Sequence, residues 1–264
     1  MKRSLLPALF LPFVLLLGGA ARAEVQTKAI EYKDSDVPLR GYLAWDDSAQ
    51  GPRPGVIVVH EWWGLNDYAR KRAEQLAGMG YVAFAVDMYG DDKVTEHGNQ
   101  AQEWMQQITA NIEAWRRRAL LGLDLLRKQD QVNPQKVAAI GYCFGGATVM
   151  EMAYSGADLA GVVSFHGSLP PATPEDLGRI KARILVEHGG SDSFVPPERV
   201  AKFQDALNQA GADWRMVING GAKHSFTNPG ADSYGIDGLA YNAEADRRSW
   251  QDMQDFFAEI FGSD

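Results

Sequence analysis

The chain has 264 residues, of which 45% are hydrophobic and 23% are charged, with 27 glycines and 12 prolines. This globular composition excludes disordered, collagen-like and coiled-coil proteins. The single cysteine, Cys143, excludes an internal disulfide and a cysteine-rich metal centre. The formal net charge is −8 and no block of Lys and Arg stands out, so nucleic acid is not an expected partner.

Residues 1–23 have the three-part layout of a secretory signal peptide. Two basic residues are followed by an apolar run over residues 5–17 and by the small-residue site Ala21-Arg22-Ala23. The run is shorter than the roughly 20 residues of a membrane-spanning helix, and two prolines interrupt it, which favours cleavage over an uncleaved anchor. We therefore expect a secreted or periplasmic protein, with a mature domain over residues 24–264 that has no membrane partner.

Short apolar runs alternate with helical patterns along the mature chain. A hairpin is expected first, from Val25–Tyr32 and Leu39–Trp45, and this alternation then predicts one doubly wound, mostly parallel sheet with helices on both faces. The later strands are predicted at Gly55–His60, Tyr81–Asp87, Lys136–Gly141, Leu159–Phe165, Arg183–Glu187 and Asp213–Ile218. Helices are predicted at Asp67–Met79, Gln100–Gln129 with room for one break, Phe144–Tyr154, Pro197–Ala210 and Ala240–Phe261.

A G-x-S-x-G elbow with cysteine in place of serine lies between a predicted strand and a predicted helix. Gly141 and Gly145 supply the small residues that so tight a turn requires on either side of the nucleophile. The turn places the sulfur of Cys143 at the positive end of the following helix, where a thiolate is favoured. The alternative is a buried, inert cysteine in a glycine-rich turn, but the strand and helix around the motif favour a nucleophile.

A catalytic triad follows in the chain order that this turn requires, with the acid and then the histidine after the nucleophile. Of five histidines, only His224 comes after the last predicted strand, and Asp192 follows the strand before it. Cys143 would attack an acyl carbon, His224 would move a proton, and Asp192 would orient the imidazole. The backbone N–H groups of Trp62 and Phe144 would face the developing oxyanion.

Each residue also has a plainer interpretation. Asp192 would cap a turn, and His224 would be a surface histidine. His166 follows a strand near the same rim and is a candidate pocket residue. The histidines lack HExxH or paired i,i+4 spacing, so neither a metal nor another cofactor is expected. Three further histidines are expected to be packing or solvated groups: His60, His188 and His97.

These residues together resemble the dienelactone hydrolase family, a branch of the α/β-hydrolases. The resemblance covers nearly all of the mature chain and is carried by VIVVHEWWGLNDYARKRAEQLAGMGYVAFAVDMYG, GYCFGG, HGGSD and AKHSF. It implies an α/β-hydrolase fold that cleaves a carboxylic ester or lactone. It also implies that Glu61 contacts the resting thiol of Cys143 until substrate binding moves the sulfur towards the histidine. Without the resemblance, Glu61 would be a salt-bridged carboxylate at the pocket rim.

The chain departs from this family at the arginines that hold a substrate carboxylate. Neither residues 87–92 nor residues 225–228 contain an arginine. An anionic dienelactone is therefore disfavoured, and an uncharged or differently anchored ester or lactone is expected. With His166, the residues expected to form the substrate pocket are Trp63, Tyr89, Tyr142 and Phe226.

The leading hypothesis is therefore an exported hydrolase of small esters or lactones that works as a monomer, since the fold needs no partner to bury its core. A thioesterase or acyltransferase would use the same chemistry. A weakly active ligand-binding or sensing protein could keep the same fold, because a fold alone does not establish activity. The candidate triad argues against this last alternative.

Overall fold

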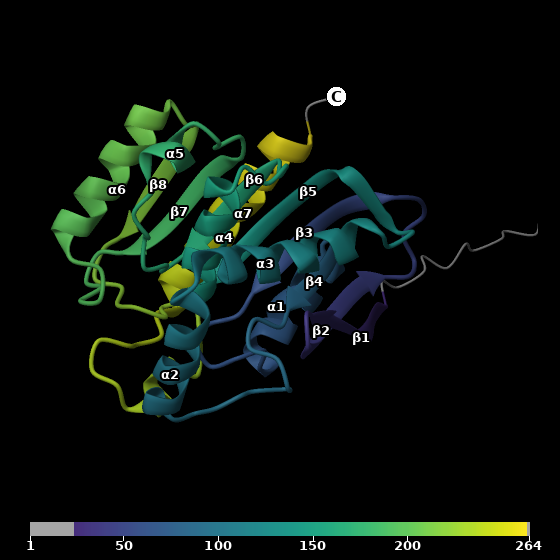
Figure 1. The fold of residues 1–264 in the computed structure, drawn as a ribbon, viewed down its shortest axis with the longest axis horizontal. Helices are drawn as coiled ribbons and strands as arrows, with labels where there is room; N and C mark the ends of the chain where they lie inside the picture. Colours follow the sequence, from purple (N-terminus) through teal and green to yellow (C-terminus); the bar gives the residue numbers. More distant parts are fainter. Residues whose placement is uncertain (1–23, 263–264) are drawn as a thin grey trace, which may run out of the picture.

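The structure is a computed structural model that describes residues 24–262, and the predicted signal peptide lies outside these residues. Within them, eight strands form one sheet in the order β1-β2-β4-β3-β5-β6-β7-β8 (Figure 1). β2 is antiparallel to both neighbours, and every later pair in this order is parallel, which confirms the predicted mostly parallel sheet. The strands are β1 (Val25–Asp34), β2 (Val37–Asp46), β3 (Arg53–Val59), β4 (Val82–Val86), β5 (Val132–Tyr142), β6 (Gly161–Phe165), β7 (Arg183–Gly189) and β8 (Trp214–Asn219).

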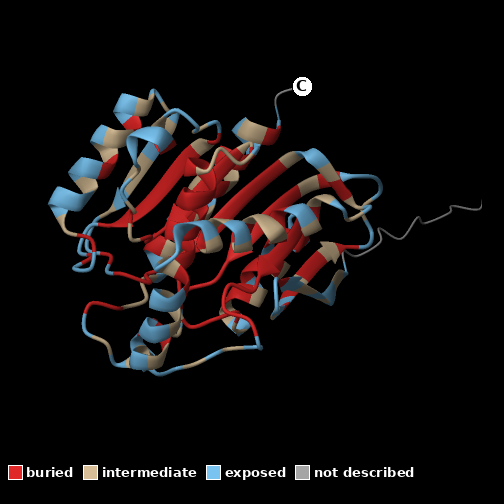
Figure 2. Ribbon diagram, in the orientation of Figure 1, coloured by how far each residue is buried: buried red, intermediate tan, exposed pale blue. Residues whose placement is uncertain are grey.

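Helices cover both faces of the sheet, and the alternation of strand side chains creates a separate core on each face. In β3, Val56 and Val58 pack in the core under α1 and α7, whereas Ile57 and Val59 pack in the core under α3, α4 and α6. Figure 2 shows buried central strands and helices exposed on their outer sides. The helices are α1 (Asp67–Gly78), α2 (Gly98–Thr109), α3 (Ile112–Arg127), α4 (Phe144–Tyr154), α5 (Pro174–Leu177), α6 (Pro197–Ala210), α7 (Ala243–Phe261) and the 3₁₀ helix η1 (Ala231–Tyr234).

Local capping explains where the predicted elements differ from the observed ones. The long helical stretch is divided into α2 and α3 because Asn111 caps α3 by accepting a hydrogen bond from the backbone N–H of Ala114. The last helix starts three residues later than predicted, because Asn242 caps it in the same way. The short α5 was not predicted, and it rests on a capping box between Thr173 and Asp176.

The parallel register brings the candidate site together. Tyr142 pairs with Phe165, and Phe165 in turn pairs with Glu187. Cys143 follows Tyr142, and His166 follows Phe165. Both therefore come at the ends of neighbouring strands at one edge of the sheet, where ligands of such sheets bind. Among the helices of residues 24–262, none combines the length and apolar character that a bilayer-spanning segment requires.

Candidate active site

The turn that carries Cys143 adopts the strained geometry expected from its glycines. Cys143 has φ 55° and ψ −114°, a left-handed φ that costs a non-glycine residue roughly 1–3 kcal/mol. A Cβ atom on Gly141 would lie 2.0 Å from the carbonyl oxygen of Gly145, and one on Gly145 would lie 2.2 Å from that of Val59. Only glycine fits at both positions, so the strand can turn at once into α4.

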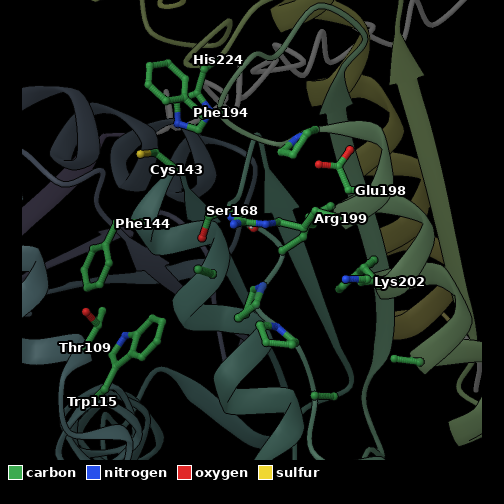
Figure 3. A pocket seen from close by; sticks show the side chains of 18 of the residues that line it. Thr109, Trp115, Cys143, Phe144, Ser168, Phe194, Glu198, Arg199, Lys202 and His224 are labelled. Carbon is green, nitrogen blue, oxygen red and sulfur yellow. The ribbon is translucent and has the colours of Figure 1, made fainter.

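His224 and Asp192 meet above the same edge of the sheet. Nδ1 of His224 lies 2.8 Å from Oδ2 of Asp192, and both side chains are buried. The other oxygen of Asp192 accepts the backbone N–H of Phe194 at 2.9 Å. Cys143 acts on the His224 ring strongly enough to raise its pKa, and Figure 3 shows the two residues at one end of a cavity. The structure thus brings the three predicted residues together in the expected order.

The electrostatics of this group favour a cationic imidazole. Burial acts to lower the pKa of His224, but the charge of Cys143 and the hydrogen bond to Asp192 outweigh it and raise that pKa to about 10. For Asp192, burial acts to raise the pKa, and the hydrogen bond with His224 outweighs it, so the pKa lies below its ordinary value. An imidazolium between a carboxylate and a sulfur atom stabilises a thiolate.

Two backbone N–H groups are available for an oxyanion. Phe144 is the first residue of α4, where a helix has no internal acceptor for its N–H groups. Trp62 follows β3 on the adjacent loop. Within the part of the chain that the structure describes, neither N–H donates a hydrogen bond to a protein acceptor. Both residues line the cavity beside Cys143, and their role towards an oxyanion stays a prediction.

The backbone of the loop after β3 is fixed by hydrogen bonds from His60 and Tyr89. Nδ1 of the buried His60 lies 2.5 Å from the carbonyl oxygen of Glu61, and its Nε2 accepts the N–H of Met88 at 3.2 Å. Burial lowers the pKa of His60, so the ring is neutral, with its proton on Nδ1. The hydroxyl of Tyr89 donates to the carbonyl oxygen of Trp62 at 3.1 Å. These contacts fix the backbone from which the N–H of Trp62 projects.

The Glu61 side chain binds the loop that carries the histidine. Its two oxygens accept hydrogen bonds from the hydroxyl of Ser225 at 2.6 Å and the amide of Asn228 at 2.5 Å. Burial raises the pKa of Glu61, and these two bonds offset part of that rise. The expected contact with the Cys143 thiol is not among the hydrogen bonds of the described residues, because both oxygens of Glu61 bind the histidine loop. A resting state with the thiol against Glu61 stays a prediction.

A cavity of about 1060 Å³ opens beside Cys143 and His224. Figure 3 shows Thr109 and Trp115 on one side of it, and Glu198, Arg199 and Lys202 of α6 on another. The remaining wall comes from the chain segment 168–174, which is rich in proline. No motif marks these wall segments. The signal that could have found segment 168–174 and α6 is topological, since they follow β6 and β7 at the edge that carries the nucleophile.

The substrate pocket predicted from aromatic residues is wrong in its membership. None of the five predicted pocket residues lines the cavity, and all five are buried. Trp63 stacks on Tyr234 with ring centroids 3.8 Å apart, and Tyr142 stacks on Phe165 at 4.9 Å. Large apolar side chains beside a strand end gain more by filling the core than by facing solvent. The residues so corrected are Trp63, Tyr89, Tyr142, His166 and Phe226.

Comparisons with known proteins bear on the family and the fold of this chain. The model of the dienelactone hydrolase family matches residues 39–261. A candidate carboxymethylenebutenolidase of Yersinia pestis is 27% identical over 251 residues, which cover 89% of this chain and 91% of the relative. The crystal structure of a dienelactone hydrolase-like promiscuous phosphotriesterase from metagenomic libraries is 43% identical. It superposes with a TM-score of 0.87 over 89% of this chain and 98% of its own.

A more distant structure supports the fold alone. An α/β-hydrolase enzyme from a deep-sea metagenome library of the Medee basin is 15% identical, with a TM-score of 0.65. The match covers 92% of this chain and all of the other chain. The α/β-hydrolase fold implied by the sequence is thereby confirmed.

Proposed function

Because this chain belongs to the dienelactone hydrolase family of hydrolases, we propose that it cleaves carboxylic esters or lactones with Cys143 as nucleophile. The observation that carries the proposal is the row formed by Cys143 and the buried His224 and Asp192, with 2.8 Å between imidazole and carboxylate. An inert cysteine would need neither this pairing nor a strained turn at the mouth of a cavity.

The reaction follows from these positions. The Cys143 thiolate attacks the acyl carbon, and the carbonyl electron pair moves to the oxygen, which the N–H groups of Trp62 and Phe144 stabilise. Collapse of this intermediate breaks the bond to the alcohol oxygen, and His224 donates its proton to that oxygen. Water then attacks the thioester while His224 removes its proton. The sulfur leaves as thiolate and regenerates the enzyme.

The cavity supports an uncharged acyl region near the nucleophile. Trp62, Phe144 and Trp115 line it, Figure 3 shows Phe144 between Cys143 and Trp115, and neither stretch 87–92 nor 225–228 contains an arginine. Such walls stabilise apolar groups, and the two stretches offer no arginine to hold a carboxylate.

The decisive experiment compares wild-type protein and Cys143→Ala on aryl esters, lactones and thioesters. Ester or lactone turnover that Cys143→Ala abolishes supports the proposal. Equal rates for the two proteins contradict it. Preference for thioesters favours the thioesterase or acyltransferase alternative, and binding without turnover of any substrate favours the ligand-binding alternative.

We propose phosphotriester hydrolysis as a second activity, since the 43% identical relative is described as a promiscuous phosphotriesterase. A neutral triester suits a cavity in which no arginine lies in the loop stretches 87–92 and 225–228. Attack of the thiolate on phosphorus would expel the aryloxide and leave a dialkylphosphoryl group on sulfur, which water then hydrolyses. Diethyl 4-nitrophenyl phosphate is the probe, and nitrophenolate release that requires Cys143 is the expected result. Release at the same rate from Cys143→Ala would contradict it.

We also propose that residues 1–23 direct export and are removed after Ala23, which leaves a secreted or periplasmic monomer. The proposal rests on the sequence layout of this segment. Intact mass of the protein recovered from a bacterial periplasm tests it. A mass that includes residues 1–23 would contradict the cleavage, and light scattering coupled to size exclusion would report the oligomeric state.

A further inference from the structure

A fully buried histidine lies directly beneath the nucleophile turn. His166 follows β6 and has no exposed surface, and it does not line the cavity. The backbone N–H of Cys143 points at two acceptors on this strand end, the carbonyl oxygen of Phe165 at 3.0 Å and Nδ1 of His166 at 3.1 Å. His166 also has a left-handed φ, of 40°. Two strained residues thus support each other through one N–H group.

The contacts of the ring define its protonation. Nδ1 accepts the N–H of Cys143, so the ring proton is on Nε2, which lies 2.7 Å from Oγ1 of Thr227. Burial lowers the pKa of His166 well below its ordinary value, and the positive charges of His224 and Arg72 lower it further. The ring is therefore neutral, with one nitrogen that accepts and one that donates.

Thr227 lies on the loop that carries the catalytic histidine, three residues after His224. Its hydroxyl is 2.6 Å from the hydroxyl of Tyr68 on α1, and its carbonyl oxygen accepts Nη2 of Arg72 at 2.7 Å. Arg72 is itself paired with Asp246 of α7 at 2.5 Å. Thr227 is thus fixed against the body of the protein, and its hydroxyl presents a fixed partner to His166.

We propose that His166 is a positioning residue that connects the nucleophile turn to the histidine loop and sets the approach of the Cys143 sulfur to the imidazole of His224. The chain of contacts runs from the N–H of Cys143 through the ring of His166 to Thr227. It needs a side chain that accepts at one end and donates at the other, and neutral histidine does both. The proposal rests on Cys143 being the nucleophile, as proposed above.

The contacts around the ring argue against a role in packing alone. The His166 ring packs edge-on against the rings of His224 and Phe226, with centroids 5.3 Å and 5.2 Å away. Phenylalanine at position 166 would keep these ring contacts and lose both hydrogen bonds. A packing role therefore predicts that His166→Phe is tolerated, whereas a positioning role predicts that it is not.

The single cysteine provides a direct test, because iodoacetamide alkylation reports on the Cys143 thiolate alone. In His166→Phe we expect the midpoint pH of alkylation to rise by about one unit, because a displaced thiolate loses its imidazolium partner. We also expect kcat/KM for a neutral ester to fall by about tenfold or more, mostly through kcat. His166→Asn keeps an acceptor for the N–H of Cys143 and should restore part of both losses.

Thr227 supplies a second test that does not disturb the ring. Thr227→Val removes the hydroxyl at nearly constant volume and should shift the alkylation profile in the same direction, while Thr227→Ser should restore it. His97→Asn, at an exposed position before α2, is the control. Wild-type alkylation profiles in both folded His166→Phe and Thr227→Val would overturn the proposal. If His166→Phe does not fold, the Thr227 pair decides alone.

These outcomes are separate from the failure of the proposed function. Alkylation does not require turnover, so the profiles can be measured even if no ester is cleaved. Full ester hydrolysis by Cys143→Ala would end the nucleophile proposal. A wild-type enzyme that needs Cys143, combined with unshifted profiles in both variants, would reject only the role of His166.

Discussion

The two ends of the active-site cavity differ in how firmly their side chains are held. At the nucleophile end, Asp192, His224 and Glu61 are buried, and each has a hydrogen-bond partner on another loop. At the α6 wall, Arg199 and Lys202 are exposed, and the described hydrogen bond of Arg199 is a long one, 3.4 Å to the carbonyl oxygen of Ser168. Figure 3 shows both regions around one cavity.

This difference separates chemistry from selection. Bond making tolerates little displacement of the reacting groups, so the residues that orient them, Asp192, His224 and Glu61, are buried and hydrogen-bonded. A wall that contacts the part of a substrate far from the reacting bond tolerates more movement, and its cationic side chains need no ion-pair partner. Apart from Arg53, which is buried, Arg199 is the one described arginine without an ion pair.

The largest loss is expected from Cys143→Ala. Removal of the nucleophile should lower kcat/KM for a neutral aryl ester by at least about 10³-fold, because the remaining groups only bind and polarise the substrate. Steady-state kinetics measure the loss, and circular dichroism confirms that the variant is folded. Residual activity above a tenth of wild type would mean that another group performs the attack.

Asp192→Asn should cost somewhat less, on the order of 10²–10⁴-fold in kcat. The amide keeps the size of the carboxylate, but it neither stabilises the imidazolium nor enforces the Nδ1–H tautomer. Ser193→Ala is the control, because Ser193 is the exposed neighbour of Asp192, and this variant should keep kcat near wild type. A small effect of Asp192→Asn would mean that Asp192 only caps the turn, by accepting the N–H of Phe194.

The comparison also explains what sequence alone could predict. The elbow was predictable because a turn at φ 55° between Gly141 and Gly145 admits few sequences, and the triad order then located Asp192 and His224. Strand positions followed from apolar runs that parallel sheets require. Their ends were less certain: β5 begins at Val132, four residues before the predicted start, because Arg53 and Pro54 of β3 extend the pairing.

The cavity wall and the buried network were not predictable in this way. An aromatic residue beside a strand end is equally suited to the core and to a pocket. Trp63 lies in the core because its ring stacks on Tyr234, which is distant in the chain. The partners of Glu61 are 164 and 167 residues away in the chain, and those of His166 are 23 and 61 residues away, so their geometry depends on how the loops pack. The position of His166 at a strand end near the rim predicted a pocket role, and only the contacts show that its ring is buried away from the cavity.

A stability effect of intermediate size is expected at His224. Its pKa is about 10 in the folded chain, above the ordinary 6.5, so its protonation stabilises the fold fully below pH 6.5, and this contribution is lost as pH rises through 10. The free energy of unfolding can be measured with urea for wild type and for His224→Asn. The difference between the two proteins should fall by on the order of 3 kcal/mol between pH 6 and pH 10.

The control for this measurement is Cys143→Ala. The charge of Cys143 is the largest of the effects that raise the pKa of His224, so the same difference measured in a Cys143→Ala background should be smaller. A difference that does not change with pH in either background would show that His224 is neutral in the folded protein.

The smallest effects are expected at the α6 wall. Arg199→Met should leave kcat for a neutral ester within about twofold, because an exposed cation contributes little to uncharged groups. For an ester with a carboxylate far from the scissile bond, KM should rise by a few fold at low salt, and the rise should vanish near 1 M salt, where charges are screened beyond about 3 Å. Glu198→Gln removes the opposite charge from the adjacent residue and should shift KM the other way.

A fall in kcat for the neutral ester would place Arg199 among the residues that hold the reacting groups, and the contrast between the two ends of the cavity would no longer hold.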